Sequence, residues 1–401
     1  MNYSIDYEKG VVNAGNDKRI ASCMLRAMKG EPLKLAFLGG SITQGSLAST
    51  PKCCYAYRTY DWWKKAFPLS DIAYINAGIG GTSSHLGTAR VEEDVLRYHA
   101  DFIIVEFAVN DQDDSSHFME TYEGLIRRIL KNKFCPALLL VHNVRYDDGK
   151  NAEQIHGPVG EYYDVPSVSM KSAIYPYVAE GKIALRDITS DNLHPNDKGH
   201  ELVADVITHY LDAVKNKLGN GGKPYISSDQ QIPKKPITKN GYEDACRLRN
   251  TDLIPSICTG FIRDDSQQSS VADFFKKGWS ARNVGDRITF EVYGASIAVQ
   301  YRKTIRKPAP IAKLTLDGDA NQTVILDANF NEDWGDCLYL ETILHHGTCG
   351  KHTIDIEVIE ANEENNEDFY LVSIIIAGKK KEHAFCTDET DRSESKKVRI
   401  K

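Results

Sequence analysis

The most informative segment of the chain is Leu33-Lys34-Leu35-Ala36-Phe37-Leu38-Gly39-Gly40-Ser41-Ile42-Thr43-Gln44-Gly45. An apolar run of strand length ends in a glycine pair, and a serine follows at once. Ligands of parallel sheets collect beyond the carboxyl ends of the strands, so Ser41 stands where chemistry is expected. The alternative is that Ser41 is only the N-cap of the helix that follows.

The residues around this serine exclude three glycine-rich motifs. Gly40 and Gly45 have the spacing of a phosphate loop, but Ser46 and Leu47 stand where that loop needs Lys and Ser/Thr. The Gly-x-Gly-x-x-Gly pattern of dinucleotide sites is missing. Thr43 replaces the second glycine of the Gly-x-Ser-x-Gly hydrolase elbow. What remains is a serine on a tight turn.

Strand-like and helix-like segments alternate through the first half of the chain. The expected strands are 33–38, 73–76, 101–109, 137–143 and 182–186, and the expected helices are 58–66, 91–99, 122–131 and one from 197 onward. This alternation predicts an α/β domain in which helices cover both faces of a parallel sheet.

The pattern changes after residue 219, where a Gly- and Pro-rich stretch stops the last helix. The following polar segment predicts a linker at 221–240, between a first domain at 1–220 and a second at 241–401. The second domain holds short strand-like pieces separated by Gly, Asn and Asp turns, which predict an antiparallel sandwich.

Composition limits the classes of function. Of 401 residues, 41% are hydrophobic and 26% are charged, and the net charge of −7 argues against a nucleic-acid partner. The apolar runs are too short to span a membrane, so we expect no membrane partner. Residues 1–9 lack the features of a signal peptide, and the nine cysteines fit reduced thiols, so we expect a cytoplasmic protein. The oligomeric state stays open.

Three further pieces follow predicted strand ends. The glycines of 76–82 let a backbone N–H approach a ligand, or form a plain turn. The stretch 105–111 ends in Asn110-Asp111, where a carboxamide can donate to an oxyanion or form an Asx turn. In 191–196, Asp191 could orient His194 toward the serine, although a surface loop can hold the same pair.

Together the four pieces resemble the SGNH (GDSL-like) hydrolase superfamily, whose blocks centre on Ser, Gly, Asn and His. Ser41, Gly81, Asn110 and His194, with Asp191, match these blocks one by one. The Gly-Gly-Ser-Ile-Thr form of the first block is similar to the branch rich in carbohydrate O-acetyl esterases. That branch is often fused to a β-rich domain of carbohydrate-binding type.

The resemblance implies a three-layer α/β/α, flavodoxin-like catalytic domain followed by a jelly-roll-like accessory domain. It implies a serine esterase that removes O-acetyl groups from oligosaccharides, such as mannan or xylan fragments, through an acyl-enzyme on Ser41. His194 is then the base and Asp191 its orienter. The backbone N–H groups of Ser41 and Gly81 and the side-chain amide of Asn110 form the oxyanion hole.

Two other functions stay open at this stage. One is a short-chain carboxylesterase or a lipid or thioester deacylase, and the other is a non-catalytic glycan-binding protein on a hydrolase fold. Trp334 is a candidate sugar platform in the second domain. Trp62 is a weaker candidate, because core packing explains it better than sugar stacking does.

We expect neither a cofactor nor a metal in the catalytic site. His345, His346, Cys349 and His352 cluster in the sequence, but their spacing is not that of a zinc site. Neighbouring residues of a strand also point to opposite faces, which separates the paired histidines. The sequence leaves open a structural calcium ion in the sandwich.

Overall fold

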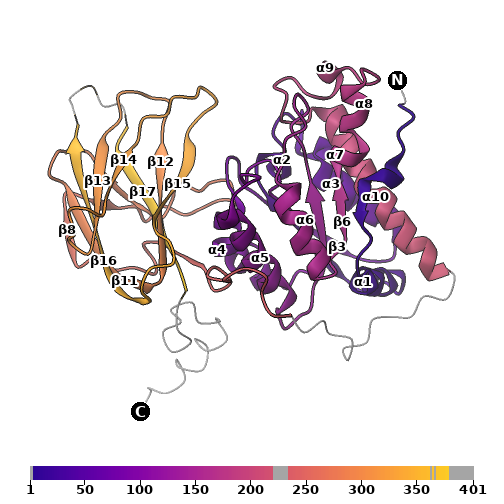
Figure 1. Ribbon diagram of the computed structural model, residues 1–401, viewed down its shortest axis with the longest axis horizontal. Coiled ribbons are helices and arrows are strands. Elements are labelled where there is room, and N and C mark those ends of the chain that lie inside the picture. The colour runs from indigo at the N-terminus through magenta and orange to yellow at the C-terminus, as the bar shows by residue number, and fades with distance from the viewer. Residues whose placement is uncertain (1–2, 220–233, 362–363, 365–366, 379–401) are drawn as a thin grey trace, which may run out of the picture. The chain divides into compact units, whose positions relative to one another are not determined.

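The computed structural model describes residues 3–219, 234–361, 364 and 367–378. The chain divides into two compact units, which Figure 1 shows with their helices and strands labelled. Unit 1 comprises Met1–Glu243, Ser266–Lys276 and Asp336–Tyr339, and unit 2 comprises Asp244–Asp265, Lys277–Gly335 and Leu340–Lys401. Most of the linker expected at 221–240 lies outside the described residues.

Unit 1 is built on a six-stranded sheet of order β1-β6-β5-β4-β2-β3. Its strands are β1 (Val11–Asn13), β2 (Leu33–Gly39), β3 (Ile72–Gly78), β4 (Phe102–Glu106), β5 (Ala137–His142) and β6 (Ser167–Ser169). All neighbouring strands are parallel except β1, which pairs antiparallel with β6. The predicted α/β fold is confirmed.

The described helices of unit 1 lie between and beyond these strands. They are α1 (Lys18–Met28), α2 (Ser41–Gln44), α3 (Tyr55–Ala66), α4 (Ser84–Asp94), α5 (Ser116–Leu130), α6 (Glu153–Tyr162), α7 (Met170–Ala173), α8 (Tyr175–Ala179), α9 (Leu185–Ile188) and α10 (Asp197–Gly219). Short 3-10 turns occupy Tyr7–Gly10, Pro51–Cys53 and Leu96–Tyr98. None of the described helices combines the length and apolar character that crossing a membrane requires.

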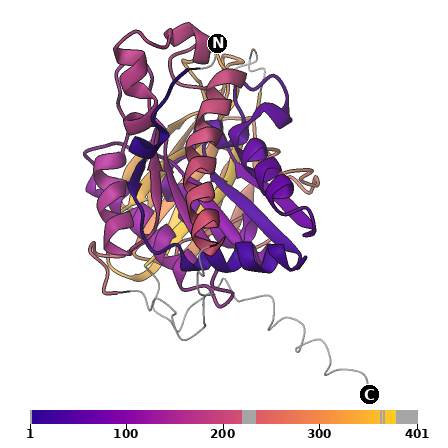
Figure 2. The same cartoon turned by 90° about the vertical axis from the view of Figure 1, so that its right-hand side faces the viewer.

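The alternation of side chains along each strand produces two hydrophobic cores, one on each face of the sheet. On β2, Leu35 and Phe37 join the core that contains α1, α3 and α10. Ala36 and Leu38 join the opposite core, which contains residues of α4, α5 and α6. Figure 2 shows α10 lying across the face of the sheet. Because both faces are covered, only the strand ends can hold a site.

The strand predicted at 182–186 is wrong. Leu185–Ile188 forms the short helix α9, and the last parallel strand is β6, whose three residues are too few to give a sequence signal. Ile183 is buried, but its backbone N–H donates to Tyr177 O in a turn rather than to a strand. A short apolar run does not distinguish these outcomes.

Residues just before unit 2 pack on unit 1. Glu123 of α5 is buried, and its carboxylate accepts the backbone N–H groups of Ile237 (2.8 Å) and Thr238 (2.9 Å). Arg127, one turn further along α5, forms an ion pair with Glu243 at 2.8 Å. The compact part of unit 1 therefore continues through the described residues 234–243.

Unit 2 consists of two antiparallel sheets, as predicted for the second domain. Its strands are β7 (Cys246–Leu248), β8 (Ile257–Thr259), β9 (Ile262–Arg263), β10 (Trp279–Ala281), β11 (Arg287–Gly294), β12 (Ser296–Lys303), β13 (Ile311–Leu316), β14 (Thr323–Asp327), β15 (Cys337–Leu344, which belongs to unit 2 from Leu340 onward), β16 (Gly350–Glu360) and β17 (Phe369–Ala377). One sheet has the order β15-β12-β17-β10-β9, with β7 also paired to β17, and the other has β14-β13-β16-β11-β8. The rings of Trp279 and Phe290, 4.9 Å apart, pack one sheet on the other.

Candidate active site

Three polar side chains from distant parts of the chain meet at the carboxyl end of β2. Ser41 is the first residue of α2, and Asp191 and His194 lie in the loop before α10. His194 Nε2 is 2.8 Å from Ser41 Oγ, and His194 Nδ1 is 2.6 Å from Asp191 Oδ2. The N-cap of α2 is Gly40 rather than Ser41, so the serine hydroxyl is directed to the imidazole. This chain of contacts joins the three residues assigned to catalysis from the sequence.

The Asp191 carboxylate fixes the orientation of the imidazole. Burial alone would raise the pKa of Asp191, but hydrogen bonds from the His194 ring and from the backbone N–H groups of His194 and Leu193 outweigh it, and the pKa is lowered. An ionised Asp191 accepts a hydrogen bond from the N–H at His194 Nδ1, a tautomer that we assign from these contacts. The lone pair on Nε2 then faces the Ser41 hydroxyl, as a general base requires.

The loop that carries Asp191 and His194 is held by the loop after β5. Asn192 adopts a φ of 74°, a left-handed conformation that asparagine tolerates. Its backbone carbonyl accepts the N–H of Tyr146 at 2.8 Å, and its side-chain amide donates to Asp147 at 3.3 Å. These contacts keep the base close to the nucleophile without help from the substrate.

The turn before Ser41 depends on close packing of backbone. A Cβ at Gly78, the last residue of β3, would lie 2.2 Å from the backbone nitrogen of Gln44 in α2. A Cβ at Gly39 would lie 2.5 Å from the carbonyl oxygen of Glu106. Glycine at both positions lets the three strand ends converge on α2.

Arg90 and Gln44 hold this turn from two sides. Arg90, fully buried in α4, donates to Gly39 O at 3.1 Å while pairing with Asp94 at 3.0 Å. Gln44 Oε1 accepts the N–H of Gly80 at 2.6 Å, linking α2 to the glycine-rich loop after β3. Gln44 lies inside the first sequence block, but its contact with Gly80, 36 residues away, cannot be recognised from the sequence.

The residues proposed for the oxyanion hole lie around the same turn. A Cβ at Gly80 would lie 3.7 Å from the Ser41 Cβ, which puts the glycine loop beside the nucleophile. Gly81 has a φ of 67°, a conformation that glycine adopts without strain. A Cβ at Gly40 would lie 2.2 Å from Asn110 Oδ1, so the Asn110 amide packs directly against the residue before Ser41.

A buried carboxyl group lies beneath the nucleophile turn. Glu106, the last residue of β4, is fully buried, and the Thr43 hydroxyl donates to its Oε2 at 3.4 Å. Burial raises the pKa of Glu106 to about 7, although hydrogen bonds to the carboxylate oppose the shift. The sequence hints at this buried carboxyl group only by placing one acidic residue, Glu106, inside the apolar run Phe102–Ala108.

The two tryptophans proposed as sugar platforms differ in exposure. Trp62 of α3 is half-buried, with its ring 5.8 Å from that of Trp63 and 6.1 Å from that of Phe67, so it is packed against the core. Trp334, in the loop before β15, is 56% exposed, and its ring meets that of Phe330 edge-on at 4.9 Å. Trp334 is therefore the better candidate of the two.

The rings of His345 and His346 lie 4.2 Å apart, beyond the end of β15 at Leu344, so the predicted separation of this pair onto opposite faces of a strand is wrong. His352 has protein partners of its own. His352 Nδ1 bonds to Asp317 at 2.7 Å and its Nε2 lies 3.1 Å from Thr348 O, so both ring nitrogens have protein partners. The side-chain hydrogen bond to Asp317 is the main reason why the His352 pKa is raised despite its partial burial. Because both ring nitrogens already have protein partners, His352 offers no free nitrogen to a metal.

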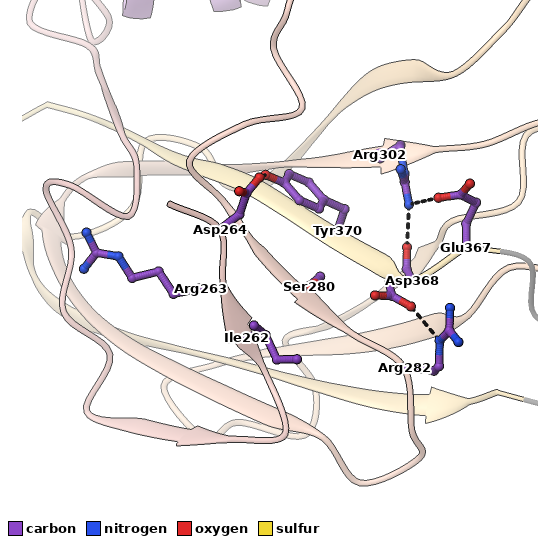
Figure 3. Close-up of a pocket in the computed structure, with 9 residues that line it drawn as sticks. All are labelled: Ile262, Arg263, Asp264, Ser280, Arg282, Arg302, Glu367, Asp368 and Tyr370. Carbon is purple, nitrogen blue, oxygen red and sulfur yellow. Dashed lines mark hydrogen bonds and ion pairs between the residues drawn. The ribbon is translucent and has the colours of Figure 1, made fainter. Parts of the chain in front are cut away.

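A polar pocket of about 400 Å³ opens on unit 2 (Figure 3). It is lined by Ile262, Arg263, Asp264, Ser280, Arg282, Arg302, Glu367, Asp368 and Tyr370. Arg282 pairs with Asp368 at 2.6 Å, and Arg302 pairs with Glu367 at 2.7 Å. The charges of the wall thus pair largely with one another, which suits a neutral ligand better than an ion.

Comparisons with known proteins find a family model and solved structures that are similar to this chain. Residues 37–202 match the model of the GDSL-like Lipase/Acylhydrolase family. A solved structure of a two-domain esterase (CEX) active on acetylated mannans, co-crystallised with mannopentaose, is 50% identical, with 95% of this chain and 100% of that chain covered and a TM-score of 0.88. A second structure of a two-domain esterase (CEX) active on acetylated mannans is also 50% identical, covering 94% and 100%, with a TM-score of 0.89. No curated protein matches the sequence.

Proposed function

Because the chain belongs to the GDSL-like lipase/acylhydrolase family, we propose that it is a serine esterase that removes O-acetyl groups from mannan-derived oligosaccharides. The observation that carries the chemistry is the continuous contact from Ser41 Oγ through the His194 ring to Asp191, at 2.8 and 2.6 Å. The substrate rests on the 50% identity to an esterase active on acetylated mannans.

The reaction begins with attack of Ser41 Oγ on the acetyl carbonyl, while His194 Nε2 takes the hydroxyl proton. The negative charge that develops on the carbonyl oxygen is held by the backbone N–H groups of Ser41 and Gly81 and by the Asn110 amide. Collapse of the tetrahedral intermediate breaks the bond to the sugar oxygen, which receives the proton from His194. The products are a free sugar hydroxyl and an acetyl ester on Ser41.

Water completes the cycle by the same steps. His194 removes a proton from a water molecule, which attacks the acetyl-serine, and then returns the proton to Ser41 Oγ as acetate leaves. Asp191 stays ionised throughout and stabilises the imidazolium that forms twice in each cycle. The residues of unit 1 thus account for both halves of the reaction.

We also place the enzyme in the cytoplasm, where its substrates would be imported oligosaccharides. Supporting this, eight cysteines in the described part of the chain are free thiols, which suits a reducing compartment.

A panel of acetylated oligosaccharides tests the proposal. Wild type should remove acetyl groups from acetylated mannopentaose, detected by mass spectrometry, and Ser41→Ala should remove none. Ser116→Ala, which removes another serine from the first position of a helix, is the matched control and should behave as wild type. Ser41-dependent turnover of acylated lipids or thioesters, with acetylated mannopentaose left intact, would instead favour the deacylase alternative.

A further inference from the structure

One carboxylate outside the triad connects the two loops that carry oxyanion donors. Asp111 follows Asn110 directly, and the backbone N–H groups of both residues donate to Phe107 O, at 3.1 and 3.0 Å. The Asp111 side chain is fully buried. Its position is therefore fixed in the same turn that holds the Asn110 amide.

The first contact of this carboxylate reaches the glycine loop. Asp111 Oδ1 accepts the backbone N–H of Ser84, the first residue of α4, at 2.9 Å. The N-cap residue Ser83 makes no side-chain capping bond, so Asp111 supplies the cap from a distant segment. A carboxylate at a helix N-terminus also interacts favourably with the helix dipole.

Gly81 lies three residues before Ser84, and the intervening loop has little freedom. The Thr82 hydroxyl is buried and donates to Ile79 O at 2.7 Å, closing the loop on itself. Fixing Ser84 therefore fixes the Gly81 N–H with respect to the turn at Asn110.

The second contact anchors the carboxylate from behind. Asp111 Oδ2 lies 3.0 Å from His156 Nε2 of α6, and both side chains are fully buried. The His156 ring stacks on the Tyr122 ring of α5, with centroids 3.6 Å apart and planes 7° apart. His156 Nδ1 has no hydrogen-bond partner among the described residues, so we assign the proton to Nε2, which donates to Asp111.

We propose that Asp111 is a positioning residue, with its carboxylate holding the Asn110 amide and the Gly81 N–H at their correct separation and His156 as its anchor. The inference rests on the proposed esterase function. An oxyanion hole works only if its donors are in place before charge develops, and small displacements of a reacting group cost large factors in rate. In Asp111→Asn one of the two acceptor oxygens becomes an N–H donor, so the bonds from Ser84 N–H and from His156 Nε2–H cannot both be kept while the imidazole holds its proton on Nε2.

The test is the kinetics of Asp111→Asn with 4-nitrophenyl acetate. We expect kcat to fall roughly tenfold to a hundredfold, with KM changed by less than about twofold, because the donors bind the transition state. Glu123→Gln is the matched control, since it also neutralises a buried carboxylate that holds backbone N–H groups, but in the 237–238 segment. Glu123→Gln should retain the wild-type kcat even where its stability falls.

A double-mutant cycle separates positioning from general destabilisation. If Asp111 acts through the oxyanion donors, Asp111→Asn costs a clearly smaller factor in kcat when Asn110→Ala is already present. An equal factor in both backgrounds, or a wild-type kcat for Asp111→Asn, overturns the inference. If hydrolysis by wild type does not depend on Ser41, the proposed function fails instead, and the same assay with Ser41→Ala reveals this.

A second pair of variants tests the anchor independently, should Asp111→Asn not fold. His156→Gln can present an N–H near the original Nε2, whereas His156→Leu removes the donor at similar volume. We expect kcat to be higher in His156→Gln than in His156→Leu. Equal kcat values in two folded variants contradict a role for His156 in holding Asp111.

Discussion

Asn110 is the one side chain among the three proposed oxyanion donors, so its contribution can be removed by substitution. Its amide packs against Gly40, directly before the nucleophile. Asn110→Ala should lower kcat roughly a hundredfold or more, which corresponds to about 3 kcal/mol of transition-state stabilisation. KM should change little, and steady-state kinetics on an acetyl ester measure both. A large rise in KM at unchanged kcat would assign Asn110 to substrate binding instead.

Glu106 gives a pH-dependent prediction at the same scale. Burial raises its pKa to about 7 from an ordinary value of 4.5, so the folded protein keeps the carboxyl protonated over a range where the unfolded chain ionises it. The folded state therefore loses stability as the pH rises from 4.5 through 7. The loss attributable to this group is on the order of 3 kcal/mol.

Glu106→Gln tests this directly because glutamine is neutral at every pH and nearly isosteric. From pH 5 to pH 8, the free energy of unfolding of wild type should fall relative to that of Glu106→Gln. Urea unfolding at several pH values measures it. Parallel curves for the two proteins would show that Glu106 ionises normally in the fold.

The residues proposed for the chemistry have clearer signals in the sequence than the residues that hold them in place. Ser41, Asn110, Asp191 and His194 follow strand or loop signals in separate blocks, and the structure brings Ser41, Asp191 and His194 into contact. Gln44 gives no comparable signal, because its role comes from a tertiary contact. A glutamate inside a strand, such as Glu106, indicates a perturbed pKa only once its burial is known.

Strand β3 and helix α2 pack so closely at Gly78 that no side chain fits there. The Cβ added by Gly78→Ala would lie 2.2 Å from the Gln44 nitrogen, so strand and helix must separate. We expect a loss of about 1–3 kcal/mol in stability and a fall in kcat, since α2 begins with Ser41. Thermal unfolding and the esterase assay measure the two effects.

Gly350→Ala is the control for this prediction. Gly350 begins β16, and the nearest atom to an added Cβ is 3.9 Å away, so alanine fits without strain. Its stability should equal or slightly exceed that of wild type, because alanine restricts the unfolded chain. Equal behaviour of the two alanine variants would mean that β3 and α2 are not packed as described.

The elements that the sequence predicts well are the long ones with a clear pattern. Strands β2, β4 and β5 are apolar runs of strand length, and α10 has the helical periodicity of a core-facing helix. β6 was missed because three residues are too few to establish a pattern. β1 was missed for the same reason. The run 182–186 was wrongly predicted as a strand because a short apolar run does not distinguish a strand from a buried turn.

At the scale of the whole molecule, unit 2 offers an exposed aromatic residue suited to sugar binding. Trp334 is 56% exposed and is held edge-on by Phe330. Trp334→Ala should weaken binding of mannopentaose roughly tenfold, or about 1.4 kcal/mol, while hydrolysis of 4-nitrophenyl acetate stays unchanged. Isothermal titration calorimetry measures the affinity.

Ile254→Ala is the matched control, because Ile254 is 90% exposed in the same unit but has no aromatic face. It should bind mannopentaose as wild type does. Wild-type affinity in both variants would remove Trp334 from the sugar-binding surface.

The two-unit organisation was predicted from the change in sequence pattern near residue 219, because apolar residues recur at different spacings in α/β and all-β segments. The extent of unit 1 did not follow from that pattern. Residues 234–243 are polar and look like linker, yet they pack on α5 because the Glu123 carboxylate and Arg127 need partners. Such a boundary depends on tertiary contacts rather than on local composition.

Covalent labelling can show whether His194 activates Ser41 as the nucleophile. Wild type treated with an alkyl fluorophosphonate should take up one phosphonyl group on Ser41, located by peptide mass spectrometry, with loss of activity in step with labelling. His194→Ala should label far more slowly. Full activity in a protein labelled at Ser41, or inactivation with the label on another residue, would contradict the account.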